Sequence, residues 1–126
     1  MYFEIPGTIR IKKNSRRIFP KKGGKGIINL PSKAYKEWEE MVRWHVISRL
    51  DPHWEPSKGL VHVRFVAYYK GPKPDLSGAM ESVGDAFEGM LWEDDTQIES
   101  WDGSRLIHDK ANPRLCFWAE QFGDNL

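Results

Sequence analysis

The clearest pattern along the chain is an alternation of apolar and polar residues from Leu60 to Tyr69. Successive side chains of a β-strand point to opposite faces of a sheet, so this alternation predicts a half-buried strand. The buried face would carry Val61, Val63, Phe65, Ala67 and Tyr69, and the other face His62, Arg64 and Tyr68.

A first amphipathic helix is predicted to follow Pro31. Ser32 is a suitable N-cap, and Asp51-Pro52 ends the helix near Leu50. Apolar residues recur at intervals of three and four, which places them on one stripe that faces the core. The stripe consists of Tyr35, Trp38, Met41, Val42, Val46 and Leu50.

A second amphipathic helix is predicted from Gly78 to about Leu91, after the glycine and proline residues of Lys70–Pro74 break the preceding strand. Its apolar side is formed by Ala79, Val83, Ala86, Phe87 and Met90. Its opposite side carries Glu81, Asp85 and Glu88. The helix therefore presents a row of acids to its surroundings.

Four further segments are predicted to be strands, and with the helices they define the fold class. They are Tyr2–Ile5, Gly26–Leu30, Thr96–Asp109 with a bulge or turn at Asp102-Gly103, and Arg114–Phe122. A chain of 126 residues has room for one compact core. We therefore expect a single α+β domain over residues 1–126, with a mixed sheet and two main helices.

Cysteine usage and the N-terminus indicate the compartment. The only cysteine, Cys116, cannot form an intramolecular disulfide, and it shows no zinc-ligand spacing with the four histidines. The first residues lack the features of a signal peptide, and no window approaches 18 apolar residues. We expect a cytoplasmic protein without a membrane partner, in which Cys116, Trp101 and Trp118 pack in the core.

The net charge of +1 conceals a strong asymmetry. Residues 1–50 carry 12 Lys/Arg against 4 Asp/Glu, and residues 51–126 carry 7 against 14, which gives +8 followed by −7. The predicted loop over residues 7–25 contains no acid and eight bases, which are Arg10, Lys12, Lys13, Arg16, Arg17, Lys21, Lys22 and Lys25. Such density favours phosphate binding over a merely solvated surface, and roughly six phosphate contacts would give log K a slope near −5 against log salt.

The acidic half contains the candidate chemistry. Asp75 and Ser77 lie where the central strand leads into the second helix, and Asp95 lies where that helix leads into the next strand. Both ends are expected to meet at one edge of the sheet. Carboxylates about 6 Å apart repel by about 3 kcal/mol per pair at an effective dielectric of about 20, and a divalent cation relieves this repulsion. Hard oxygen ligands favour Mg²⁺ or Mn²⁺; the alternative is a solvated acidic surface.

The order of residues across this region resembles one family. It runs Lys73-Pro74-Asp75-Leu76-Ser77-Gly78, then Glu81, then Gly84-Asp85-Ala86-Phe87-Glu88-Gly89, then Trp92-Glu93-Asp94-Asp95-Thr96-Gln97-Ile98. This pattern resembles the RusA-type Holliday-junction resolvases, closely over residues 73–98 and in element order along the chain.

The resemblance implies a Mg²⁺-dependent homodimeric endonuclease that binds four-way DNA junctions and makes paired nicks in recombination and repair. Asp75 matches the first catalytic aspartate of the family and Asp95 the last, while Asp85 matches a helix acid with a mainly structural role.

Two positions depart from the family pattern. Ser77 stands where the family has its second aspartate, and Glu81 stands where it has an essential lysine. We hypothesise that the carboxylate has moved, so that Asp75, Glu81 and Asp95 are the catalytic and metal-binding residues. Ser77 would then cap the helix or bind a water ligand, and Lys73 or Lys110 would supply the missing cation.

Two other functions remain open from the sequence. One is a weakened or inactive relative that binds branched DNA without cutting it, and the other is an acidic protein-interaction module with no role on DNA. DNA-binding residues are expected to be the eight bases of residues 7–25 together with Lys73. His62 and Arg64 are also candidates to touch DNA, although exposed sheet residues are more often only solvated.

Overall fold

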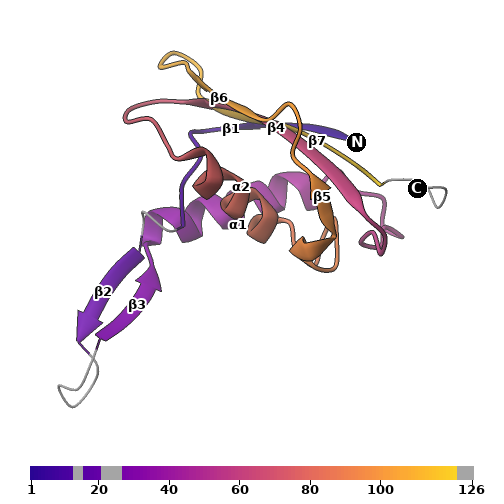
Figure 1. Cartoon of the computed structure of the whole chain (residues 1–126), viewed down its shortest axis with the longest axis horizontal. Helices are drawn as coiled ribbons and strands as arrows, with labels where there is room; N and C mark the ends of the chain where they lie inside the picture. Colours follow the sequence, from indigo (N-terminus) through magenta and orange to yellow (C-terminus); the bar gives the residue numbers. More distant parts are fainter. Residues whose placement is uncertain (13–15, 21–26, 122–126) are drawn as a thin grey trace.

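The computed structural model describes residues 1–12, 16–20 and 27–121, with the backbone alone described for residues 16–20 and 27–31. A mixed five-stranded sheet carries two helices, and Figure 1 shows both helices on the same side of the sheet. The predicted α+β class is therefore confirmed. No helix in the described part of the chain is long and apolar enough to cross a membrane.

The centre of the sheet is β4 (Val61–Tyr69), the strand predicted from alternation. Its predicted buried face is confirmed, because all five residues on that face are at most 9% exposed. β7 (Arg114–Gln121) pairs antiparallel with β4, and β1 (Tyr2–Pro6) pairs antiparallel with β7. On the other side of β4, β5 (Ile98–Ser100) and β6 (Arg105–His108) both run parallel to it.

Helix α1 spans Lys33–Ile47 and confirms the first predicted helix. Its N-cap is Ser32, whose Oγ accepts a hydrogen bond of 3.1 Å from the backbone N–H of Tyr35. The predicted apolar stripe faces the sheet, with Tyr35, Trp38, Val42 and Val46 buried, and Met41 and Leu50 packed at its margin.

Helix α2 spans Leu76–Ala86, so both of its predicted ends were wrong. Its N-cap is Asp75 and not Ser77: Asp75 Oδ2 accepts the Gly78 N–H at 3.3 Å, while Ser77 Oγ donates to the same oxygen at 2.8 Å. The helix stops at Ala86, and four of the next six residues turn inward. Gly89 takes a φ of +79°, and Phe87, Met90, Leu91 and Trp92 are buried against the sheet.

The segment predicted as one strand with a bulge or turn is three elements. A 3-10 helix, η1 (Asp95–Gln97), precedes β5, and a turn at Gly103 separates β5 from β6. Glycine is required in this turn for two reasons. Its φ is +87°, and a Cβ at this position would lie 2.5 Å from Cδ of Arg64.

The basic segment is partly a β-hairpin, so its description as one long loop was wrong. β2 (Arg16–Pro20) pairs antiparallel with β3 (Ile27–Pro31), which confirms the second predicted strand with a one-residue shift. The hairpin projects away from the sheet and helices as an arm (Figure 1). Lys13, Lys21, Lys22 and Lys25 lie outside the described residues.

Candidate active site at the C-terminal end of helix α2

Three carboxylates gather where α2 ends and η1 begins. Glu88, Asp94 and Asp95 each offer one oxygen, and these three oxygens lie within 4.8 Å of one another. Glu88 follows the last turn of α2, and its Oε1 accepts the backbone N–H of Asp95 at 3.2 Å. We call these three residues the acidic centre.

The backbone of the acidic centre is held by a reciprocal cap around η1. Asp94 Oδ1 accepts the Thr96 N–H at 2.9 Å, and the Asp94 N–H donates to Gln97 Oε1 at 2.8 Å. Gln97 Nε2 in turn donates to the carbonyls of Ser57 and Gly59, at 2.7 and 2.9 Å. The acidic loop is therefore tied to the segment that leads into β4 as well as to the short strand β5 that follows it.

The end of α2 is fixed from inside and from α1. Trp92 is fully buried, and its Nε1 donates to the carbonyl of Gly84 at 3.2 Å. Arg43 of α1 donates from Nη1 to the carbonyls of Ala86 and Glu88, at 2.5 and 3.3 Å. A cation at a helix C-terminus also interacts favourably with the helix dipole. Arg43 thus positions the backbone that carries Glu88.

The pKa values within the acidic centre diverge. The pKa of Asp95 is raised, first by partial burial and then by the negative charges of Glu88 and its other acidic neighbours. The pKa of Asp94 is lowered, mainly by the backbone hydrogen bond from Thr96. Of these two aspartates, Asp95 is thus the one whose ionised form the fold accommodates less well, and a nearby cation would favour that form.

The donor set of the acidic centre fits a hard divalent cation. All three side chains are carboxylates: Asp94 and Asp95 are exposed, and Glu88 is partly exposed. They repel one another when ionised. Oxygen-only donor sets of this kind suit Mg²⁺ or Mn²⁺. Glu88, Asp94 and Asp95 are therefore the residues that would hold the metal within one chain.

Glu81 borders the same region. It shares a hollow of about 250 Å³ with Asp95. The hollow is lined by Met80, Glu81, Gly84, Asp95, Ile98 and Trp101. Its floor is open because Gly84 has no side chain: a Cβ there would lie 3.7 Å from that of Asp95. Two of the three predicted metal ligands, Glu81 and Asp95, thus lie around one hollow.

Asp75 lies at the other end of α2. Its Oδ2 is near Gly78, whereas Asp95 is near Gly84, and six residues of α-helix rise by about 9 Å. The expectation that both helix ends meet at one edge of the sheet was wrong within one chain. β5 runs parallel to β4, with Ile98 beside Val61, so the segment before β5 lies at the edge opposite to the one where β4 ends.

Asp75 has its own surroundings. It lines a hollow of about 420 Å³ together with Lys73, Pro74, Leu76, Ser104, Arg105 and Leu106. Lys73 thus lies near Asp75, with Arg105 as a second cation, while Lys110 is exposed beyond β6.

The root of the basic arm is fastened to α2. Ile9 and Ile11 are buried, and Ile11 packs so closely that a Cβ at Gly78 would lie 2.7 Å from its Cγ2. The Lys12 N–H donates to the buried Ser82 Oγ at 3.2 Å, and Lys12 Nζ lies 3.5 Å from Asp85 Oδ2. Asp85 thus contacts the root of the arm, and the structural role expected for it stays a prediction. Among the other predicted bases, Arg10 is exposed, and Arg16 and Arg17 are in β2.

Sequence reasoning missed Glu88 and Arg43 as parts of the site. It placed Asp94 in the acidic triplet of the motif but did not choose it as a metal ligand. Glu88 and Asp94 were inside the recognised motif, so their residue types and spacing were available signals. Arg43 gave no local signal, because it precedes its carbonyl partners by 43 and 45 residues.

The chain matches a known protein family. The model of the family described as Endodeoxyribonuclease RusA matches residues 8–116, which include both ends of α2 and the acidic centre. A search among curated proteins finds no match to the chain.

Proposed function

The chain belongs to the RusA endodeoxyribonuclease family, and from this premise we propose that it resolves four-way DNA junctions by paired, Mg²⁺-dependent phosphodiester hydrolysis. Mn²⁺ would be a substitute for Mg²⁺. The biological setting would be DNA recombination and repair. The observation that carries this proposal is the acidic centre, in which Asp95 has a raised pKa beside two further carboxylates.

A bound divalent cation would activate water and neutralise the charge that develops on the scissile phosphate. The chain's own residues supply the frame for this chemistry. Asp95, Asp94 and Glu88 would hold the cation, and Arg43 and Gln97 hold the backbone that carries those carboxylates. The basic arm, whose root is fixed to α2, would hold the DNA backbone.

The direct experiment is cleavage of a synthetic four-way junction with and without Mg²⁺. Cleavage that requires the metal is the expected result. Binding that weakens with salt, without any cleavage, would instead support the weakened or inactive relative. A protein that does not bind DNA at low salt would overturn both DNA functions and leave the acidic interaction module.

Glu81 is proposed as an additional metal ligand, because it lines the hollow beside Asp95. Glu81→Gln is expected to raise the dissociation constant for Mg²⁺ at least about 10-fold, the scale seen even for residues one step removed from a metal. Calorimetric titration with Mg²⁺ would measure it. Glu99→Gln, the same change at an exposed position of β5, is the matched control. Cleavage by Glu81→Gln at the wild-type rate would show that Glu81 is not a ligand.

Ser77 decides between a working and a weakened site. Its hydroxyl donates to Asp75, so an aspartate at this position would replace a donor with a second negative charge. The double variant Ser77→Asp with Glu81→Lys rebuilds the family pattern. A rise in the cleavage rate of this variant would show that the natural site is impaired, whereas a fall would show that Ser77 and Glu81 form a working alternative.

Asp75 is proposed as a catalytic residue that reaches the cation of a second chain. Within one chain, α2 separates Asp75 from Asp95, and a homodimer is also what paired nicks in a two-fold junction require. Asp75→Asn and Asp95→Asn alone are expected to be inactive. Mixing them should restore nicking of one strand but not paired cutting, because each mixed dimer then holds one complete site and one doubly altered site.

The measurement for this mixture is the ratio of nicked to fully resolved junction on a denaturing gel. Continued inactivity of the mixture, in subunits shown by mass to exchange, would place Asp75 and Asp95 in separate roles within one chain. Asp75 would then act through its place as N-cap of α2.

A further inference from the structure

The sheet has a second face that the helices do not cover. Both helices lie on one side of it (Figure 1), and on the other side no helix in residues 1–12, 16–20 or 27–121 packs against it. The side chains on this open face are exposed or partly exposed, with Cys116 as a buried exception. They include Tyr2 and Glu4 of β1, Arg114, Trp118 and Glu120 of β7, and His62, Arg64, Val66 and Tyr68 of β4.

A stacked row crosses this face. Tyr2, Trp118 and Arg64 are direct neighbours in the register of β1, β7 and β4. The rings of Tyr2 and Trp118 have their centroids 4.7 Å apart at 34°, and the Arg64 guanidinium lies 3.9 Å from the Trp118 ring centroid. We expected Trp118 in the core from the sequence, and that expectation was wrong. Trp118 lies at the centre of a surface row of flat groups.

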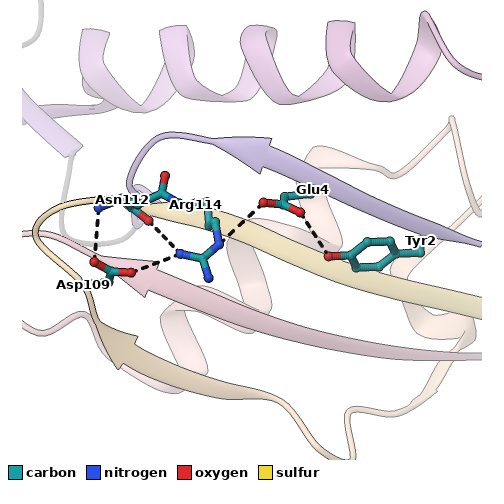
Figure 2. A network of polar contacts seen from close by, with 5 residues as sticks. All are labelled: Tyr2, Glu4, Asp109, Asn112 and Arg114. Carbon is teal, nitrogen blue, oxygen red and sulfur yellow. Dashed lines mark hydrogen bonds and ion pairs between the residues drawn. The ribbon is translucent and has the colours of Figure 1, made fainter.

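Polar contacts fix the neighbouring side chains. Figure 2 shows Arg114 between Glu4 and Asp109, with nitrogen–oxygen distances of 3.6 and 3.1 Å. Glu4 also accepts the Tyr2 hydroxyl at 3.5 Å, and the Arg114 guanidinium carbon lies 3.7 Å from the Tyr68 ring centroid. This arrangement holds the aromatic groups in place before any ligand arrives.

A hollow of about 250 Å³ opens beside Trp118. Its lining includes Trp118 and Arg64 together with His62 and Glu120, and His62 Nδ1 lies 3.3 Å from Glu120 Oε1. The lining thus offers hydrogen-bonding groups beside two flat side chains. Such a site suits a planar ring with a polar edge.

The charge of the open face argues for bases over phosphates. Arg114 is matched by Glu4 and Asp109, and His62 lies against Glu120, so the face has no excess of positive charge to attract a phosphate backbone. Aromatic rings and arginine planes on which bases stack are the usual means of binding unpaired nucleotides. Because the chain belongs to a family that acts on DNA, the planar polar ring that this site would meet is a nucleobase.

We propose that the open face of the sheet is a second DNA-contact surface, on which an unpaired base stacks along the Tyr2–Trp118–Arg64 row. This inference rests on the proposed function, because a four-way junction that is opened on binding would present unpaired bases near its branch point. The sheet separates this face from the acidic centre, so the stacked base belongs to a different part of the branched DNA than the strand that is cut.

The test compares Trp118→Ala with Trp44→Ala. Trp44 is 64% exposed on α1, so its removal is the same chemical change on another surface. Binding without Mg²⁺ to a junction with unpaired bases at the branch point, and to a fully paired duplex, is measured by fluorescence anisotropy over a range of salt. Trp118→Ala should bind the unpaired junction roughly 10-fold more weakly, the size of one lost base–aromatic stack.

The salt dependence separates stacking from backbone binding. Trp118→Ala should keep the wild-type slope of log K against log salt, whereas Arg10→Gln should reduce that slope by about 1 if Arg10 contacts a phosphate. Tyr2→Ala removes the exposed end of the row and should give a smaller loss in the same direction, which keeps the test valid if Trp118→Ala folds poorly.

Three results would overturn the inference. They are unchanged affinity of both Trp118→Ala and Tyr2→Ala, an equal loss on the paired duplex, and a fall in oligomeric mass by light scattering, which would make the face a contact between two copies of the chain. If the wild type cuts junctions while Trp118→Ala binds normally, only this inference fails. If Trp118→Ala weakens binding but the wild type never cuts, only the nuclease proposal fails.

Discussion

Asp95→Asn is expected to lower the rate of Mg²⁺-dependent cleavage of a four-way junction by at least about 100-fold, while the protein still folds and binds DNA. The amide keeps the shape of the side chain near Gly84 and removes the charge that binds the cation. Single-turnover cleavage and anisotropy on the same junction measure the two properties separately. Asp102→Asn, in the exposed turn between β5 and β6, is the matched control and should cut normally.

The same variant should be more stable than the wild type without metal at pH 7. The folded-state pKa of Asp95 is raised, so the folded protein binds this proton more tightly than the unfolded chain does. The ionised form is therefore a cost to folding, which sets in as the pH rises above about 4 and is complete above the folded pKa. The asparagine variant avoids that cost, so its free energy of unfolding should exceed that of the wild type.

Added Mg²⁺ should reverse this order. A ligand that binds only the folded state raises its stability, so the wild type should gain in melting temperature while Asp95→Asn gains little. If Asp95→Asn is less stable than the wild type without metal and responds equally to Mg²⁺, the acidic centre is not the metal site. That outcome would also support the alternative that these acids form a solvated surface without a metal.

Phe87→Ala is expected to cause a large loss of stability, about 3–5 kcal/mol in the free energy of unfolding. Phe87 is fully buried just beyond the end of α2, and its ring stacks on Phe117 of β7 with centroids 4.6 Å apart. The ring also meets Trp92 edge-on, with centroids 6.3 Å apart. Urea denaturation measures the change.

Phe87→Leu is the control for this prediction, because it keeps most of the volume and should cost less than about 1.5 kcal/mol. Equal losses for leucine and alanine would indicate that ring stacking, and not cavity formation, dominates at this position. Since Phe87 precedes Glu88 in the chain, Phe87→Ala should also lower the affinity for Mg²⁺ at temperatures where the protein is still folded.

The elements were predicted well wherever a local pattern determined them. The alternation in β4 and the Ser32 cap of α1 arise from residues within a few positions of one another. The N-cap of α2 was harder to predict, because aspartate and serine are both good N-caps. The choice of Asp75 over Ser77 depends on the path of the chain after β4. Its C-terminal end depended on packing of Phe87 and Trp92 against the sheet, which the helical spacing does not reveal.

The assembly of the site could not be predicted from spacing alone. The position of Asp95 depends on β5 lying parallel to β4, and strand direction is a property of pairing between distant segments. Parallel strands joined through a helix place the two ends of that helix at opposite edges of the sheet, and the expected meeting of Asp75 with Asp95 overlooked this rule. Trp118 was misplaced because its face of the sheet depends on the register with β4.

Gln97 shows how a recognition motif can contain a residue that takes no part in chemistry. Both of its amide hydrogens go to backbone carbonyls and its oxygen accepts a backbone N–H, so the side chain is committed to the chain itself. A glutamate has the same shape, but its carboxylate is negatively charged and has no hydrogen to donate to the two carbonyl oxygens. Position 97 of the motif therefore requires a side chain that both donates and accepts hydrogen bonds. A sequence with another residue type there has to support its acidic loop through other contacts.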